Sequence, residues 1–266
     1  MNQNKIQKRL SYWSDFLLAM TEKEIKARYK HASLGFLWVL LNPLLQMLVI
    51  GFVFQFFVPV QTDNYFLFLF SGLLPWNFFS MSITKTTPMF VYERSLIQKA
   101  KFPRESIIIS IVLSNFFHLA ISLMLFLPIA LLFGMGNLIN WLVLLPALLW
   151  LLILTSGMSL LFSSLNVKYR DVNFVVQAIM PLWFYTTPVV YSLTLIPESI
   201  KNLFYLNPMT GLIALFRFGS LGYLEQAVTG NEFVSTLVIG VVTSVVFFFF
   251  GVWVFRKGSS TFDDWM

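Results

Sequence analysis

The stretch KEIKARYKHASLGFLWVLLNP, residues 23–43, marks the change from a charged segment to an apolar one. Its first eight residues carry four cations: Lys23, Lys26, Arg28 and Lys30. No charged residue then occurs until Asp63. A long uncharged run after a cluster of cations is typical of a membrane-spanning helix whose cytoplasmic end is anchored by Lys and Arg. The stretch therefore predicts a membrane protein and the point at which the chain enters the membrane.

Composition supports the same class. The 266 residues are 58% hydrophobic and 11% charged, against about 25% charged in an average soluble domain. We therefore expect an all-α membrane protein with a single membrane domain, residues 1–266. The net charge of +6 does not indicate nucleic acid binding, because most of the chain is too apolar to be wetted. The absence of Cys excludes disulfides and Cys-ligated metals.

The uncharged runs predict six transmembrane helices, because a span needs about 20 apolar residues. The run 106–167 contains 62 uncharged residues, about 93 Å as a helix, so it must hold two spans and a turn. The sequence GMGN at 134–137 is the expected turn, since Gly and Asn permit left-handed backbone. The predicted spans are 34–58, 64–84, 107–133, 141–164, 173–193 and 233–255.

The segment 194–230 is apolar only in short pieces, which Asn207-Pro208 and several Gly interrupt. Pieces this short usually lie in the membrane interface or re-enter it. We expect two short re-entrant helices in the outer leaflet.

The basic residues predict the orientation. Sixteen of the 18 Lys and Arg residues lie in four segments on one side of the predicted spans: 1–33, 85–105, 168–171 and 256–266. Since Lys and Arg favour the cytoplasmic side, both termini are expected in the cytoplasm.

The N-terminal segment 1–33 also carries an apolar helical face. The residues of this face recur at spacings of three and four: Ile6, Leu10, Trp13, Leu17 and Met20. A basic amphipathic helix with this pattern is expected at the inner membrane surface. The alternative is a helix packed on a soluble partner subunit, and both can hold at once.

The predicted spans contain no Asp, Glu, Lys or Arg. This argues against an ion-coupled transporter or a selective channel, which need charge inside the membrane. His118 is the one imidazole in a span, and we interpret it as a packed or hydrogen-bonded residue. No catalytic constellation, metal cluster or P-loop motif is present in the sequence, so the chain is predicted to be neither an enzyme nor an ATPase.

Aromatic residues are abundant in the second and fifth predicted spans. Aromatic faces suit sugar rings, so we expect a subset to line a sugar path, although lipid contact and helix packing explain most of them. The candidates are Trp76, Trp183, Phe184 and Tyr185.

The cytoplasmic loop TTPMFVYERSLIQKAKFPRE, residues 86–105, has the length of a short helix between Pro88 and Pro103. Its charged residues are candidates for docking an ATPase: Glu93, Arg94, Lys99, Lys101 and Arg104. The alternative is a solvated connector. A second loop, NVKYRDV at 166–172, either caps the adjoining helices or contacts a partner.

Four motifs occur in order along the chain: RYKHASLGFLWVLLNP at 28–43, LIQKAKFPRES at 96–106, NVKYRDV at 166–172, and LNPMTGLIALFR at 206–217. Together they resemble the permease subunit of ABC-2-type polysaccharide exporters, a family that exports O-antigen, capsular polysaccharide and teichoic acid. The resemblance covers nearly the whole chain.

The resemblance implies a homodimer in the cytoplasmic (inner) membrane, paired with two copies of a separate ATP-binding subunit that holds ATP and Mg. It implies that 88–104 is a coupling helix, that 194–230 forms two outer gate helices, and that the N-terminal helix lies at the inner interface. The implied substrate is a polymer on a polyprenyl pyrophosphate lipid, entering between the first and fifth spans of opposing protomers. Arg28 and Lys30 are then candidates for contacting the pyrophosphate.

Within this family O-antigen is preferred over capsule or teichoic acid, because the short tails leave no added domain. A standalone lipid-linked sugar flippase is the alternative that the missing intramembrane charge disfavours. A membrane enzyme of envelope assembly is disfavoured by the missing catalytic residues.

Overall fold

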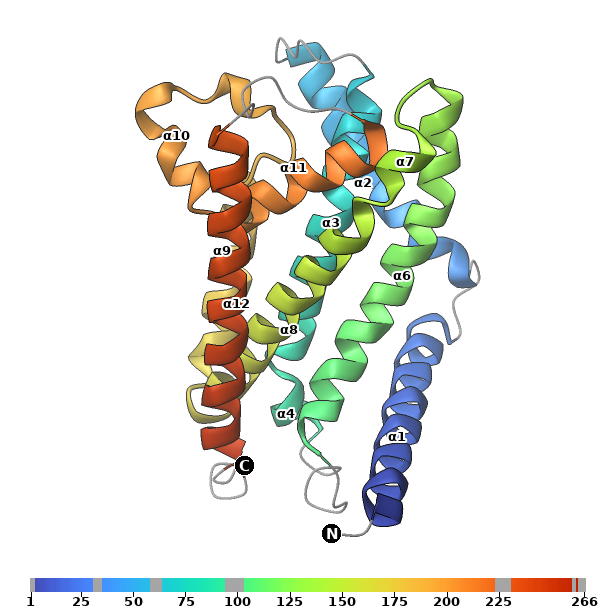
Figure 1. Ribbon diagram of the computed structural model, residues 1–266, viewed down its shortest axis with the longest axis vertical. Coiled ribbons are helices and arrows are strands. Elements are labelled where there is room, and N and C mark those ends of the chain that lie inside the picture. The colour runs from blue at the N-terminus through green and yellow to red at the C-terminus, as the bar shows by residue number, and fades with distance from the viewer. Residues whose placement is uncertain are drawn as a thin grey trace.

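A computed structural model describes residues 3–30, 35–57, 64–93, 103–222, 231–259 and 262. The described residues form helices and no strands (Figure 1). This agrees with the all-α prediction.

Within these described residues, five helical segments are long and apolar enough to cross a membrane. They comprise α2 (Trp38–Phe57), α3 (Tyr65–Thr86), α6 (Glu105–Leu132), α8 (Leu144–Lys168) together with the short α7 (Leu138–Trp141), and α12 (Asn231–Ser259). Helix α3 is the most enclosed of the five, with α2, α6, α8 and α11 (Pro208–Leu221) packed around it. The first residue of α1 (Gln3–Tyr29) and the last residue of α12 lie at the same end of the molecule (Figure 1).

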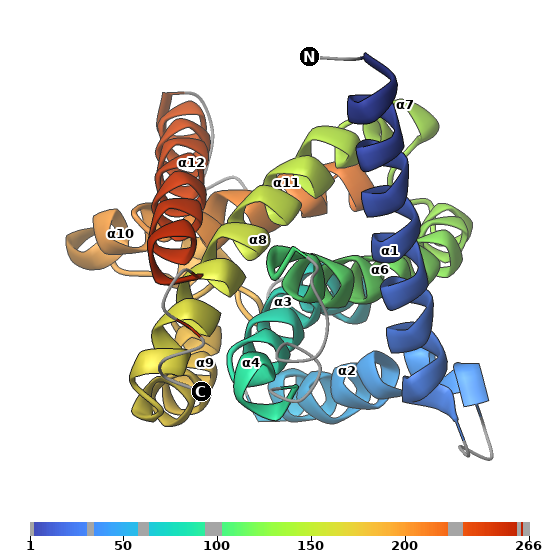
Figure 2. The ribbon, with the colours of Figure 1, turned by 90° about the horizontal axis from the view of Figure 1, so that it is seen from below.

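Helix α1 lies alongside α6 rather than within the bundle (Figure 2). Its apolar face contributes Met20, which is buried with Phe90 of α4 (Met89–Tyr92) and with Ile107 of α6. Trp13 and Leu17, on the predicted apolar face, are half-buried. The amphipathic pattern thus marks the side of α1 that meets the protein.

The turn between α6 and α8 lies where the sequence predicts it. Gly134 and Gly136 adopt φ angles of 72° and 75°, which residues with a Cβ rarely adopt. The side chain of Asn137 then accepts a hydrogen bond from the Asn140 backbone N–H and caps α7. A Cβ on Gly136 would also lie 2.6 Å from the Ser220 carbonyl oxygen, so the turn packs closely against the end of α11.

Helix α9 (Asp171–Tyr185) is shorter than the predicted span 173–193. Its 15 residues extend about 22 Å. The helix ends before Pro188, because a proline disfavours helical backbone in the residue before it. The Asn207 side chain fixes this end by donating to the Thr186 carbonyl oxygen and the Thr187 hydroxyl oxygen, at 3.3 and 2.9 Å.

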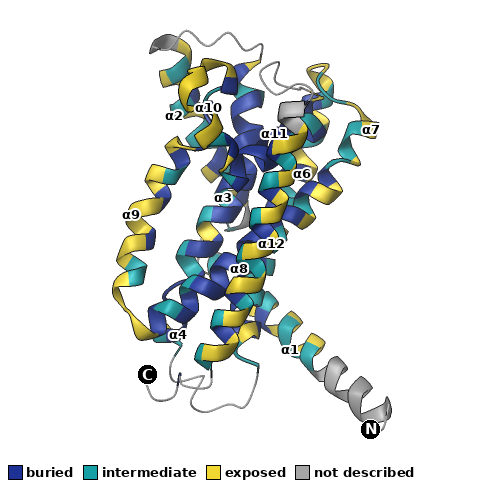
Figure 3. Ribbon diagram, turned by 60° about the vertical axis from the view of Figure 1, so that its left-hand side comes forward, coloured by how far each residue is buried: buried dark blue, intermediate teal, exposed yellow. Residues whose placement is uncertain are grey.

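Only one stripe of α9 is buried. It consists of Val176, Met180 and Phe184, spaced by four residues, and most of the other residues of the helix face outward (Figure 3). Much of that outward face is apolar, including Phe174, Ile179 and Leu182.

The segment after α9 contains the 3-10 helix η2 (Leu193–Leu195), α10 (Glu198–Tyr205) and α11. Helix α11 begins where Asn207 accepts from the Met209 N–H and Pro208 occupies the first turn, a combination suited to a helix start. It ends at Gly222, whose φ is 67°. Helix α11 crosses the long helices and is buried against α3, α8 and α12 (Figure 1).

Candidate functional site

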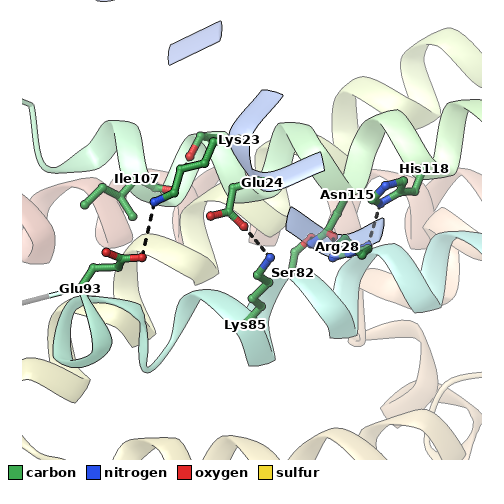
Figure 4. A network of polar contacts seen from close by, with 10 residues as sticks. Lys23, Glu24, Arg28, Ser82, Lys85, Glu93, Ile107, Asn115 and His118 are labelled. Atoms are coloured by element: carbon green, nitrogen blue, oxygen red, sulfur yellow. Dashed lines mark hydrogen bonds and ion pairs between the residues drawn. The ribbon is translucent and has the colours of Figure 1, made fainter. Parts of the chain in front are cut away.

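Among the residues that the structure describes, two ion pairs join α1 to other parts of the protein (Figure 4). Lys85, near the end of α3, lies 2.5 Å from the carboxylate of Glu24, whose side chain is only 8% exposed. Lys23 lies 3.7 Å from Glu93, the residue that follows α4. The amphipathic helix is therefore held by charge pairs as well as by its apolar face.

Arg28, one turn beyond Glu24 on α1, contacts two neutral residues of α6 (Figure 4). Its Nη1 lies 2.7 Å from His118 Nδ1, and its Nη2 donates to Asn115 Oδ1 at 2.6 Å. Because arginine can only donate, His118 Nδ1 must be the acceptor. Asn115 in turn donates to the Ser82 hydroxyl of α3 at 3.0 Å. A polar chain thus connects α1, α6 and α3.

A cavity of about 380 Å³ lies at this junction. We call it the Arg28 pocket. Residues from four elements line it, and the polar and aromatic ones include Arg28, Trp38, Asn42, Gln46, Asn77 and His118. Asn77 donates to Gln46 at 2.8 Å, so an amide pair joins α3 to α2 at one wall. Among the described lining residues none is acidic.

The two predicted lipid-contact residues differ in position. Arg28 is half-buried and lines the pocket, whereas Lys30 is exposed and does not. The interpretation of His118 as a hydrogen-bonded residue is confirmed by its contact with Arg28. Sequence reasoning missed the amides Asn42, Gln46, Asn77 and Asn115. Their rarity within charge-free spans, with Asn42 and Gln46 four residues apart, is the signal that could have found them.

The predicted docking loop is described only at its ends. Arg94, Lys99 and Lys101 lie outside the described residues. Glu93 pairs with Lys23 of α1. Arg104 donates to the Ser259 carbonyl oxygen at the end of α12 and lies 5.7 Å from the Phe262 ring centroid. The two ends of the loop are therefore bound to α1 and to α12.

The four predicted sugar-path aromatics do not form one exposed surface. Trp76 of α3 and Phe184 of α9 are buried against each other, with ring centroids 5.5 Å apart. Trp183 is half-buried, and its ring centroid lies 5.2 Å from that of Phe79. Its indole N–H donates to Asn207 Oδ1 at 3.1 Å. Tyr185 is 63% exposed. Three of the four thus hold α9 to α3 and α11, and Tyr185 alone is open.

Arg217 of α11 also contacts the apolar helices, although the sequence places it in the predicted outer segment 194–230. Its side chain is 1% exposed. The guanidinium lies 3.5 Å from the Phe68 ring centroid and donates to the Val189 carbonyl oxygen at 2.7 Å. Gly72 leaves room for it, because a Cβ there would lie 3.2 Å from Arg217 Nη2. Stacking on an aromatic face together with a carbonyl acceptor stabilises a buried guanidinium.

Across the part of the chain that the structure describes, no three His, Asp or Glu side chains lie close enough together to hold a metal ion.

Comparison with known proteins identifies the family. The model of the ABC-2 type transporter family matches residues 16–221. The O-antigen export system permease protein RfbA of Klebsiella pneumoniae is 33% identical over 259 residues, which cover 95% of each chain. The protein of the same name from Myxococcus xanthus is 34% identical over 80% of this chain and 83% of its own.

A more distant relative is the polysialic acid transport protein KpsM of Escherichia coli, 22% identical over 80% of this chain and 84% of its own. With the five apolar helices, these relatives make the chain a multi-pass protein of the inner membrane. The chain belongs to the ABC-2 type transporter family.

Proposed function

We propose that the chain is the membrane-spanning subunit of an ATP-driven exporter. The exporter moves a polyprenyl-pyrophosphate-linked polysaccharide across the cytoplasmic membrane, and O-antigen is the first candidate for this polysaccharide. The observation that carries the proposal is the similarity to RfbA along 95% of both chains. Export of a capsular polysaccharide is the second candidate, which the similarity to KpsM favours.

In this proposal the membrane domain has six spans, with α9 as the fifth. Its 15-residue helix is short for about 30 Å of hydrocarbon, so residues after Tyr185 complete the crossing. Both termini are cytoplasmic, with α10 and α11 as re-entrant outer gate helices. A single Cys at exposed Tyr169 or Leu195 in this Cys-free chain tests the fifth span. Labelling of both positions from the same side of the membrane would contradict it.

The exporter is proposed to be a homodimer of this chain with two copies of a separate subunit that binds ATP and Mg. The segment 88–104 is the coupling helix, and Arg94, Lys99 and Lys101 face the ATPase with Glu93 and Arg104. The contacts of Glu93 with α1 and of Arg104 with α12 support a path by which movement of this segment reaches the spans.

The substrate lipid is proposed to enter beside α2 and α9, where Arg28 and Lys30 attract its pyrophosphate. Support comes from the apolar faces that both helices expose. The sugar path is proposed to include Tyr185, with Trp76, Trp183 and Phe184 positioning α9 behind it. Replacing Tyr185 with Ala then lowers export without lowering yield, and unchanged export would remove Tyr185 from the path.

The first experiment is a pull-down of the solubilised chain from its native membrane, followed by an ATPase assay on the eluate. We expect a co-purifying ATPase that is lost in the triple variant Arg94→Ala, Lys99→Ala and Lys101→Ala. The matched control is Arg256→Ala with Lys257→Ala, which removes exposed cations from the cytoplasmic end of α12. The membrane is also crosslinked chemically before solubilisation in a parallel sample. If neither eluate contains ATPase activity, a standalone flippase is favoured.

A further inference from the structure

Phe262 follows the last long helix, α12, in a polar stretch of the sequence, and yet its side chain is only 2% exposed. The residues on either side of it, Thr261 and Asp263, are polar. Connecting and trailing segments of this composition usually run over the surface of a protein. The burial of this one side chain therefore needs a specific contact to explain it.

The contact is a group of three aromatic rings. The Phe262 ring centroid lies 5.2 Å from that of Phe90 on α4 and 5.7 Å from that of Phe255 on α12. The Phe90 and Phe255 centroids are themselves 5.7 Å apart, and such distances are typical of favourable aromatic pairs. Ile107 of α6 and Met20 of α1 belong to the same buried cluster. Phe262 thus completes a small core at the end of the molecule where α1 begins and α12 ends (Figure 1).

Gly258, near the end of α12, permits this packing. A Cβ at this position would lie 3.2 Å from Phe262 Cε1 and 2.7 Å from the Ser164 hydroxyl oxygen of α8. Carbon atoms in good contact are about 3.5–4.0 Å apart, so a methyl group here would push the Phe262 ring away from its place. The close approach is an observation independent of the ring contacts, and it indicates that the same seat is specific for Phe262.

The same part of the chain holds Arg104, which directly precedes α6. Its Nη1 donates to the Ser259 carbonyl oxygen. Its guanidinium lies 5.7 Å from the Phe262 ring centroid, within the distance of about 6 Å over which a cation is attracted to an aromatic face. In the sequence, Phe90 lies before the segment 94–102 and Arg104 lies after it. One side chain, Phe262, therefore contacts both flanks of this segment.

We propose that Ser259 and Phe262 form a latch that fixes both flanks of the segment 94–102 to the end of α12. Phe262 is a positioning residue, because it acts through Phe90 and Arg104. Its consequence for transport rests on the proposed function, in which the segment 88–104 receives the movement of the ATPase. Without the latch, this segment moves without carrying α6 and α12 with it, so ATP is hydrolysed with less export.

The first test uses the purified full-length chain without any partner. Trypsin can cut the segment 94–102 after Arg94, Lys99 and Lys101, and the rate of these cuts measures how often the segment opens. The variants are Phe262→Ala, Phe262→Leu and Gly258→Ala. The matched control is Phe126→Ala, because Phe126 is also buried, at 3% exposed, and packs on Phe70 outside the cluster of Phe262.

We expect Phe262→Ala to raise the cleavage rate about five-fold or more, since opening becomes more frequent when the contacts that oppose it are removed. Phe262→Leu gives an intermediate rate, because leucine fills the space but offers no ring to Arg104. Gly258→Ala raises the rate less than Phe262→Ala, and Phe126→Ala leaves it at the wild-type value. Equal rates in wild type, Phe262→Ala and Gly258→Ala would overturn the latch. If Phe262→Ala fails to fold, Gly258→Ala decides alone.

The second test measures polysaccharide exported per ATP hydrolysed in the complex with the ATPase. We expect this ratio to fall several-fold in Phe262→Ala while ATP hydrolysis continues, to recover in part in Phe262→Leu, and to keep its wild-type value in Phe126→Ala. A loss of stability alone would lower export and hydrolysis together, so an unchanged ratio would overturn the role in transport. The exporter proposal fails separately, when no ATPase co-purifies, and the cleavage rates still decide whether the latch exists.

Discussion

Arg28 and Arg217 both contact the apolar helices, and their surroundings differ. Arg217 is fully enclosed, with Phe68 against its face and the Val189 carbonyl as acceptor. Arg28 is half-buried, contacts an imidazole and an amide, and borders a cavity of about 380 Å³.

The difference separates an enclosed cation from one that borders a cavity. The region around Arg217 is filled, and Gly72 is positioned so that a side chain there would meet the guanidinium. The region around Arg28 keeps space and donors. A charge in a filled region stabilises the fold, whereas a charge beside a polar cavity can be neutralised by a ligand. The predictions below test this contrast.

The largest expected effect is loss of stability in Arg217→Ala. The change removes the stacking on Phe68, leaves the Val189 carbonyl without its donor, and opens a cavity, at a cost of about 3–5 kcal/mol. Thermal unfolding in detergent measures it. Arg256→Ala, an exposed arginine on α12, is the control and should unfold like wild type. If both variants unfold at the same temperature, Arg217 is not a structural residue.

Arg28→Gln is expected to show the opposite pattern. Export of polysaccharide falls about ten-fold or more, because a charged donor to phosphate is lost, while the unfolding temperature falls less than in Arg217→Ala. Surface polysaccharide in a strain lacking the native gene measures export. Arg28→Lys is the conservative control and should export more polysaccharide than Arg28→Gln, but less than wild type. A large drop in stability with no specific export defect would place Arg28 in the same class as Arg217.

Glu24→Gln is expected to have a moderate effect on stability, about 1–2 kcal/mol. The buried carboxylate pairs with Lys85, but that lysine is partly exposed, so solvent screens the charge left behind. Glu22→Gln is a matched control on the same helix, since Glu22 forms an exposed pair with Lys26, and this variant should unfold close to the wild-type temperature. Equal effects of the two variants would mean that burial of Glu24 contributes nothing.

The smallest expected effect belongs to the pair of Lys23 and Glu93. The two groups are 3.7 Å apart and partly exposed, so a double-mutant cycle with Lys23→Gln and Glu93→Gln should give a coupling of about 0.2–1 kcal/mol in stability. The same cycle, read out as ATPase activity of the assembled complex, tests whether α1 and the coupling segment move together. Additive effects on that activity would show that they do not.

Much of the architecture could be predicted from the sequence. Uncharged runs locate five of the long helices to within a few residues, and Gly134 and Gly136 locate the turn between two of them. These features are local, since a span needs length and apolarity and a left-handed turn needs Gly. Helix α9 ends at Tyr185, eight residues before the end of the fifth predicted span, because Pro188 and a contact with the distant Asn207 end the helix.

The sequence by itself determined the class of protein and the number and approximate place of its apolar runs. It also determined that a group of cations precedes the first apolar run. Only the tertiary structure decided what those cations do. It paired Lys23 with the carboxylate of Glu93 and left Arg28 beside the amides of α2 and α3. The physical reason is that a pocket is made by residues far apart in the chain, and nothing in local hydropathy indicates which polar side chains will face one another.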